Sequence, residues 1–164
     1  MIDIELKGKV KITDPDKGYL KARFYCAYQE RCQQEVRDKL YEWGLWTEAV
    51  ENIISKLITE NFLNEERFAK AYAGGKFRIK KWGRVKIKVE LKRRKISDYC
   101  IRQAMKEIDE DDYLKVLSEI LKARAHKTKG RKSAKRDYQI GKYIISRGFE
   151  ADLVWTLVKE ENAF

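Results

Sequence analysis

The chain has 164 residues with 37 basic and 26 acidic side chains, which gives a formal net charge of +11 and a pI near 9.5. That length suits one domain or a few small stacked units. The charge favours an acidic surface or a phosphate backbone as the partner over a small neutral ligand. No apolar run approaches the roughly 20 residues that a membrane span requires, and residues 1–13 lack the apolar centre of a signal peptide. We expect a cytoplasmic protein.

The residues that usually perform catalysis or hold a metal are scarce in this chain. The three cysteines, Cys26, Cys32 and Cys100, match no zinc spacing, and the single histidine, His126, adds no ligand set. Neither a GxxxxGK[ST] nor a GxGxxG phosphate loop occurs. The sequence therefore predicts free thiols, no metal, no cofactor and no enzymatic activity.

The N-terminal stretch precedes a clear helix start. Residues 2–12 alternate between apolar and polar side chains around Lys7-Gly8-Lys9, which predicts a short hairpin or a frayed arm. Asp14 can cap a helix and Pro15 suits the first helical position, so a helix should follow to about Glu30.

The rest of the chain is a repeat of about fifty residues. Three segments carry apolar residues at matching offsets: Val36, Leu40, Leu45 and Val50, then Ile87, Leu91, Ile96 and Ile101, then Ile140, Ile144, Phe149 and Val154. These offsets mark one face of a helix three times, so each unit should end in helix, tight turn, helix. We predict an all-α fold with an arm over 1–14 and repeats over 15–60, 61–109 and 110–164.

Turn and cap residues recur with the same period. Gly44 and Gly148 stand where a helix would end in the left-handed conformation. The middle repeat has Lys95 there, at a cost on the order of 1 kcal/mol if it is left-handed, so its turn could have a different shape. Side-chain caps are predicted at Asn64, Ser133, Thr47, Asp152, and at Ser97 or Asp98.

The repeat also decides the structure of residues 85–91. This stretch alternates apolar and charged side chains and, taken alone, is typical of a strand. Its counterparts, residues 34–40 and 138–144, do not alternate, so helix is the consistent prediction. Ile87 and Leu91 should then face the core, while Val85 and Val89 either pad a neighbouring unit or contact a partner.

Positive charge is concentrated around one tryptophan. Residues 76–95 carry eleven lysines and arginines against the single acid Glu90, whereas a merely solvated helix would interleave acids at i, i+4. Trp82 could stack on a base, anchor a protein contact, or belong to the core. A second basic cluster surrounds Gly130. The residues predicted to bind a partner or nucleic acid are Lys80, Lys81, Trp82, Arg84, Lys88, Lys92, Arg93, Lys127, Lys129, Arg131, Lys132, Lys135 and Arg136.

Three stretches of the sequence together resemble the signature of the RecX family of recombinase regulators. They are FLNEERFAKAY at 62–72, Lys81-Trp82-Gly83-Arg84, and residues 87–91 ahead of Lys95-Ile96-Ser97. The resemblance covers nearly the whole chain after Lys17, and its Arg-Phe-Ala and Trp-Gly-Arg elements are the most specific. It implies tandem three-helix units in an elongated, curved stack. Lys95 stands where the family usually has glycine, and Cys32 where it often has a serine cap.

The resemblance implies a regulator of homologous recombination, DNA repair and the SOS response, not an enzyme. Proteins of the family bind the RecA filament on single-stranded DNA, lodge in its helical groove, and suppress its ATP hydrolysis, strand exchange and co-protease activity. The positive charge suits a groove lined by acidic protein and nucleic acid. The expected partners of this monomer are the RecA filament, single-stranded DNA and, non-specifically, duplex DNA.

Two other classes of protein remain open from the sequence. In a direct DNA-binding protein, helix–turn–helix pairs would dock into duplex DNA. The basic helix lacks an Asn or Gln beside its arginines to read adenine edges, so such binding would be non-specific. In a protein scaffold indifferent to nucleic acid, binding would be independent of salt.

Overall fold

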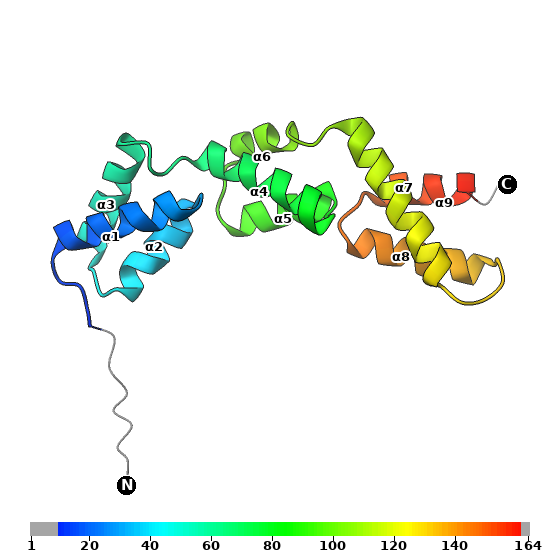
Figure 1. The fold of residues 1–164 in the computed structure, drawn as a ribbon, viewed down its shortest axis with the longest axis horizontal. Helices are drawn as coiled ribbons and strands as arrows, with labels where there is room; N and C mark the ends of the chain where they lie inside the picture. Colours follow the sequence, from blue (N-terminus) through cyan, green and yellow to red (C-terminus); the bar gives the residue numbers. More distant parts are fainter. Residues whose placement is uncertain (1–9, 162–164) are drawn as a thin grey trace, which may run out of the picture. The chain divides into compact units, whose positions relative to one another are not determined.

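The computed structural model describes residues 10–161, and all regular structure within them is helical (Figure 1). The predicted all-α fold is therefore confirmed. The chain divides into two compact units, an N-terminal unit that ends at Phe68 and a C-terminal unit that begins at Ala69. Most of the predicted arm or hairpin falls on residues 1–9, which lie outside the described residues.

The N-terminal unit contains helices α1 (Pro15–Tyr28), α2 (Gln33–Glu42) and α3 (Thr47–Thr59), which pack against one another. The start of α1 follows the prediction, since the Asp14 carboxylate accepts a hydrogen bond of 2.9 Å from the Asp16 N–H. The helix ends two residues before the predicted end. Its core includes the fully buried side chains of Ala22, Val36, Leu40, Val50 and Leu57.

The C-terminal unit contains most of α4 (Glu65–Lys80) and five further helices. These are α5 (Arg84–Arg93), α6 (Asp98–Met105), α7 (Glu110–Lys127), α8 (Ala134–Ser146) and α9 (Ala151–Glu161). Helix α5 packs on α6, and α7, yellow in Figure 1, packs on both α8 and α9. The stretch that alternates like a strand is thus helix, as the repeat predicted.

The three repeated segments bury the same positions. All twelve of the aligned residues are buried: Val36, Leu40, Leu45, Val50, Ile87, Leu91, Ile96, Ile101, Ile140, Ile144, Phe149 and Val154. Val85 and Val89 remain 46% and 44% exposed. The periodicity therefore identified the core face of each helix correctly, because only one face of each can be covered by its two neighbours.

All three tight turns have the same shape. The left-handed residue is Gly44 (φ +103°), Lys95 (φ +58°) or Gly148 (φ +98°). Each N–H donates a bond of 2.9 Å to the carbonyl three residues earlier. The suggestion that Lys95 changes the turn is therefore wrong, because tertiary packing holds a lysine in the conformation that glycine adopts at lower cost.

Two of the predicted helix caps are displaced from their expected positions. Asn64, Ser97 and Ser133 do cap their helices by accepting backbone N–H bonds. Thr47, however, is the first residue of α3, and Trp46 precedes it without a side-chain cap. Asp152 lies inside α9. The repeat fixes the first helical residue three positions after each left-handed residue, whatever side chain stands there.

Three further features of residues 10–161 concern the thiols, the metal-ligating side chains and the length of the apolar helices. All three cysteines are buried thiols outside any disulfide, and burial raises the pKa of the Cys26 thiol to about 11. Within residues 10–161, no group of histidine, cysteine and acidic side chains could hold a metal ion. In the same range, no helix has the length and apolar character to cross a membrane.

The left-handed Lys95 predicts a stabilising substitution. Lys95→Gly should raise the free energy of unfolding by about 1 kcal/mol, because glycine reaches this φ without the Cβ penalty. Urea unfolding followed by circular dichroism measures the change. Lys106→Gly is the matched control, since Lys106 has φ −68° and glycine there should not stabilise. A Lys95→Gly variant less stable than the parent would contradict this account.

Candidate partner and nucleic-acid interface

The segment that joins α4 to α5 carries the tryptophan of the basic run. Lys81 adopts a left-handed conformation with φ +55° and is exposed. Trp82 is half-buried, and two cations cover its ring: Lys76 Nζ lies 4.9 Å and Lys86 Nζ 4.3 Å from the ring centroid. Such cation–π contacts hold both lysines beside the ring, so two positive charges lie next to Trp82.

Gly83 fixes this segment to the turn between α8 and α9. Its N–H donates a bond of 3.0 Å to the Arg147 carbonyl, and the Val85 N–H donates one of 2.9 Å to the Gly148 carbonyl. A Cβ on Gly83 would lie 2.2 Å from the Gly148 carbonyl carbon. Only glycine allows the two backbones to approach so closely.

Arg84, the next residue, is bound on three sides. Its Nε donates to Glu150 at 2.8 Å, and its NH1 donates to Glu110 at 2.7 Å. The guanidinium carbon lies 3.9 Å from the Tyr113 ring centroid. Burial lowers the pKa of Arg84, but the hydrogen bonds and charges of the two glutamates outweigh burial and raise it above its usual value.

Tyr113 links this ion pair to the core. Its hydroxyl donates to Glu150 at 2.6 Å and accepts from the Arg84 N–H at 3.1 Å. Burial, followed by the bond to Glu150, raises the pKa of the phenol well above its ordinary value. The fully buried ring lies between Phe77 and Phe149, with centroids 5.7 and 5.1 Å away. Arg84 is therefore engaged within the unit, whereas the side chains of Lys80 and Lys81 before it are exposed.

The arginine of the Arg-Phe-Ala element is also engaged internally. Within the N-terminal unit, Arg67 Nε donates to Glu30 at 2.5 Å, and its NH1 donates to the Asn61 side chain at 3.1 Å. The arginines of both specific sequence elements thus hold backbone segments together.

A cationic and partly apolar surface covers the outside of α5. We call this surface the α5 face, and it consists of Val85, Lys88, Val89, Lys92 and Arg93, all exposed. Lys92 Nζ lies 3.9 Å from Asp98, and Arg93 pairs with Glu90 at 2.8 Å. Ion pairs as exposed as these contribute about 1 kcal/mol or less, so they leave both side chains available to a partner. Lys80 and Lys81 are exposed at the end of α4.

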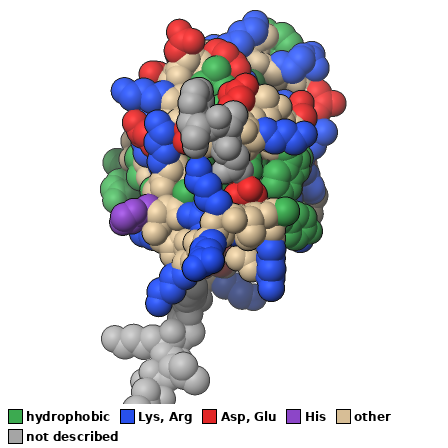
Figure 2. Space-filling view, turned by 90° about the vertical axis from the view of Figure 1, so that its right-hand side faces the viewer, with side chains coloured by type: hydrophobic (Ala, Val, Ile, Leu, Met, Phe, Trp, Pro, Cys, Tyr) green, Lys and Arg blue, Asp and Glu red, His purple; other side chains and the backbone are tan. Residues whose placement is uncertain are grey.

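The second predicted cluster surrounds the loop between α7 and α8. Five of its members are exposed: Lys127, Lys129, Arg131, Lys132 and Lys135. Arg136 differs, because its NH2 donates to the Ala125 carbonyl at 2.6 Å and its Nε to the Thr128 carbonyl at 3.3 Å. Figure 2 looks onto the C-terminal end of the chain and shows basic side chains over the whole of that face, with most of the acids in its upper part.

Sequence reasoning missed both the acids that balance Arg84 and some of the cations. Glu110 and Glu150 lie 26 and 66 residues away from Arg84, so the basic run gave no sign of them. Arg124 and Arg147 lie outside the predicted clusters, yet with Lys81 and Lys127 they line one cleft. The i, i+3 spacing of Arg124 and Lys127 places them on one helix face and was the available signal.

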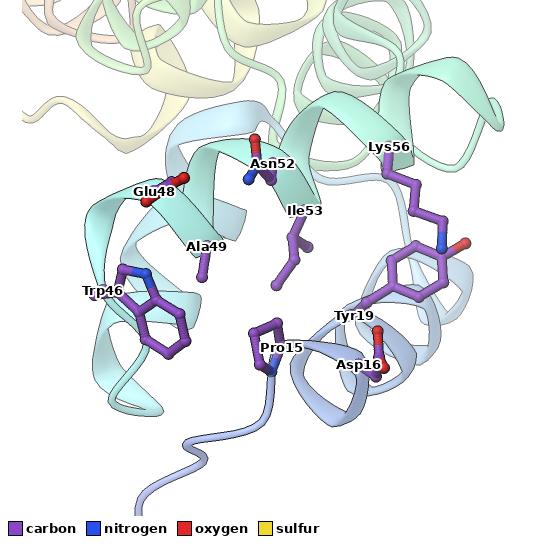
Figure 3. A pocket seen from close by; sticks show the side chains of 9 residues that line it. All are labelled: Pro15, Asp16, Tyr19, Trp46, Glu48, Ala49, Asn52, Ile53 and Lys56. Atoms are coloured by element: carbon purple, nitrogen blue, oxygen red, sulfur yellow. The ribbon is translucent and has the colours of Figure 1, made fainter.

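A separate cleft in the N-terminal unit has mixed charge. It has a volume of about 300 Å³ between α1 and α3, and Figure 3 shows Trp46 on one side of it and Asp16, Tyr19 and Lys56 on the other. The Lys56 Nζ lies 3.9 Å from the ring centroid of Tyr19. Both signs of charge line this cleft, so it has no preference for anions.

These features define an all-helical protein built of tandem three-helix units. Residues 19–57 match the model of the first three-helix domain of RecX, and residues 64–105 match that of the second. The chain belongs to the RecX family.

Individual relatives extend the match over most of the chain. Regulatory protein RecX of Prosthecochloris aestuarii is 27% identical over 142 residues, which cover 87% of this chain and 91% of the relative. Regulatory protein RecX of Bacillus pumilus is 28% identical over 160 residues, 98% of this chain and 59% of the relative. The chain thus spans little more than half of some relatives.

A solved structure has the same fold. The crystal structure of RecX from Lactobacillus salivarius superposes with a TM-score of 0.81 at 23% identity, over 92% of this chain and 97% of that one.

The contacts of Arg84 predict that its side chain stabilises the C-terminal unit. Arg84→Gln should lower the free energy of unfolding by about 2 kcal/mol, because it leaves the half-buried Glu150 carboxylate without its charged partner and removes the guanidinium from the Tyr113 ring. Lys88→Gln removes the same charge from the exposed α5 face and should change stability by less than about 0.5 kcal/mol. Urea unfolding measures both variants, and equal stability of the two would contradict the structural role of Arg84.

Proposed function

We propose that this protein binds the RecA filament on single-stranded DNA and inhibits the ATPase, strand exchange and co-protease activity of RecA. Through these activities it would act in homologous recombination, DNA repair and the SOS response. Membership of a family of regulatory proteins supports a role in regulation. The inference that RecA is the partner comes from the resemblance of the sequence to that family.

The observation that carries the proposal is the α5 face. Val85 and Val89 expose an apolar strip, and Lys88, Lys92 and Arg93 flank it with positive charge. An apolar strip with a cationic border suits an acidic protein surface, since apolar contact supplies affinity and the charges select and orient the partner. The same lysines also suit phosphates of a DNA strand bound in a filament.

The proposed interface has two parts in the C-terminal unit. The first consists of the α5 face with Lys80, Lys81 and Trp82, and the second of Lys127, Lys129, Arg131, Lys132 and Lys135 around the loop. We leave Arg84 and Arg136 out of the interface, because contacts within the unit engage both guanidinium groups.

The domain organisation that we propose follows the helices. Three repeats over 15–60, 61–109 and 110–164 would each supply three helices, after an arm over 1–14. We infer that the protein works as a cytoplasmic monomer by binding alone, without catalysis of its own.

A second candidate function is non-specific binding of DNA by the protein itself. The net charge of +11 favours it, since attraction to phosphates needs only positive charge. In that case the protein would affect RecA only by occupying the DNA.

The steady-state ATPase of RecA on single-stranded DNA separates the two functions. With the protein titrated in at fixed moderate salt, a regulator should inhibit well below the amount that covers the DNA, because it contacts the filament. Inhibition only when the DNA is covered would favour direct DNA binding. Unchanged ATPase and filament length at several-fold molar excess would exclude the proposal.

Charge reversal on the α5 face tests the location of the interface. Lys88→Glu with Lys92→Glu should weaken inhibition roughly tenfold, because two attractive charges become repulsive at the contact. Lys106→Glu with Lys115→Glu makes the same change in net charge at exposed positions outside the proposed interface and should inhibit like the parent. Equal inhibition by the two variants would exclude the α5 face. Loss of helical circular dichroism would show instead that Lys88 and Lys92 are structural.

A further inference from the structure

A cleft in the C-terminal unit has walls of one sign of charge. It has a volume of about 230 Å³ and lies between α7 and α8, beside the segment that follows α4. Four of its lining residues are basic: Lys81, Arg124, Lys127 and Arg147. Among the described residues that line it, none is acidic. Like charges brought together without a counter-charge repel one another, so this arrangement favours a bound anion.

Contacts within the protein hold the two arginines of the cleft in place. The guanidinium carbon of Arg124 lies 4.0 Å from the centroid of the Tyr143 ring, which also lines the cleft. Arg147 NH2 donates to the carbonyls of Lys80 and Lys81, the latter at 3.4 Å. Because these contacts fix both guanidinium planes in advance, a ligand would lose little entropy in ordering them.

Each of these arginines also has a donor without an acceptor. The Nε atoms of Arg124 and Arg147 are buried and have no hydrogen-bond partner within the part of the chain that the structure describes. A buried donor without a partner costs about 1–3 kcal/mol, and more for a charged group, so such donors are rare in folded proteins. Both guanidinium groups that line the cleft therefore keep donor capacity that contacts within residues 10–161 do not satisfy.

The chemistry of the walls identifies the acceptor. Guanidinium groups bind phosphate oxygens through paired N–H bonds, and lysines add point charges to the same anion. The cleft is smaller than the roughly 300–1,000 Å³ of sites that enclose whole small molecules. Its size therefore suits one phosphate group better than a complete nucleotide. The carbonyl end of α7 carries only about half a negative charge, which four cations exceed.

We propose that the cleft between α7 and α8 is a phosphate-binding site, in which Arg124 and Arg147 donate hydrogen bonds and Lys81 and Lys127 supply charge at the rim. The phosphate group belongs either to a nucleic-acid strand or to free phosphate in solution. The site shares Lys81 and Lys127 with the proposed interface. It goes beyond the proposed function, because binding of a phosphate group there requires no RecA.

Titration with pyrophosphate and inorganic phosphate at constant ionic strength tests the site directly. Amide shifts in NMR spectra of the full chain should concentrate at residues 120–127 and 143–147 and give a Kd below about 1 mM. Lys81→Gln with Lys127→Gln should weaken binding at least tenfold, and both side chains are exposed, so the variant should fold. The matched control, Lys106→Gln with Lys115→Gln, should bind like the parent.

Arg124→Gln removes one of the buried donors and should weaken binding at least as much. Shifts that are spread over the surface, or that are equal in the cleft variant and the matched control, would overturn the proposal, since they would mean general attraction of anions. Absence of any amide shift at a pyrophosphate concentration of about ten times that Kd would also overturn the proposal.

Competition with a single-stranded oligothymidylate identifies the source of the phosphate. If a strand supplies it, the oligonucleotide should displace pyrophosphate, and the cleft variant should bind the oligonucleotide more weakly than the matched control does. If free phosphate is the ligand, pyrophosphate should remain bound and the two variants should bind the oligonucleotide equally. Because RecA is absent from these measurements, their failure would leave the proposed regulation of RecA unaffected.

Discussion

The ion pair between Arg84 and Glu150, closed by the Tyr113 hydroxyl, is the interaction on which the C-terminal unit depends. It joins the start of α5 to the start of α9 and rests on a fully buried ring. Beside it, the backbone at Gly83 lies against the backbone at Gly148, and a side chain on residue 83 would prevent this approach. These contacts fix the segment that carries Lys81 and Trp82, so the same interaction that holds the fold also places the exposed cations.

Internal pairing divides the basic residues into two groups with different roles. The guanidinium groups of Arg67, Arg84 and Arg136 donate hydrogen bonds to carboxylates or backbone carbonyls that are distant in the sequence. Several lysines instead lie exposed along α5 and around the loop after α7, where a flexible stem holds a charge in water. A surface of exposed lysines beside arginines that are held within the fold is suited to reversible binding that depends on salt.

The helices and their core faces could be predicted because each depends on local periodicity. Ile87 and Leu91 were assigned to the core by comparison with Val36 and Leu40, even though the intervening residues alternate like a strand. The roles of individual charges could not be predicted, since the partners of Arg84 come from distant helices. The conformation of Lys95 could not be predicted either, because it adopts the left-handed conformation of the repeat, which a lysine side chain disfavours. The cleft that contains Arg124 and Arg147 likewise forms only when α7 and α8 pack.

The central claim is that this protein recognises the RecA filament rather than DNA alone. The most direct test is the affinity of the fluorescently labelled protein for RecA-coated single-stranded DNA and for the same bare DNA, measured across a range of salt concentrations. The account predicts tighter binding to the filament at every salt concentration, with a weaker dependence on salt, because apolar contact at Val85 and Val89 adds to the attraction between charges. Equal affinity and an equal dependence on salt for both would contradict it.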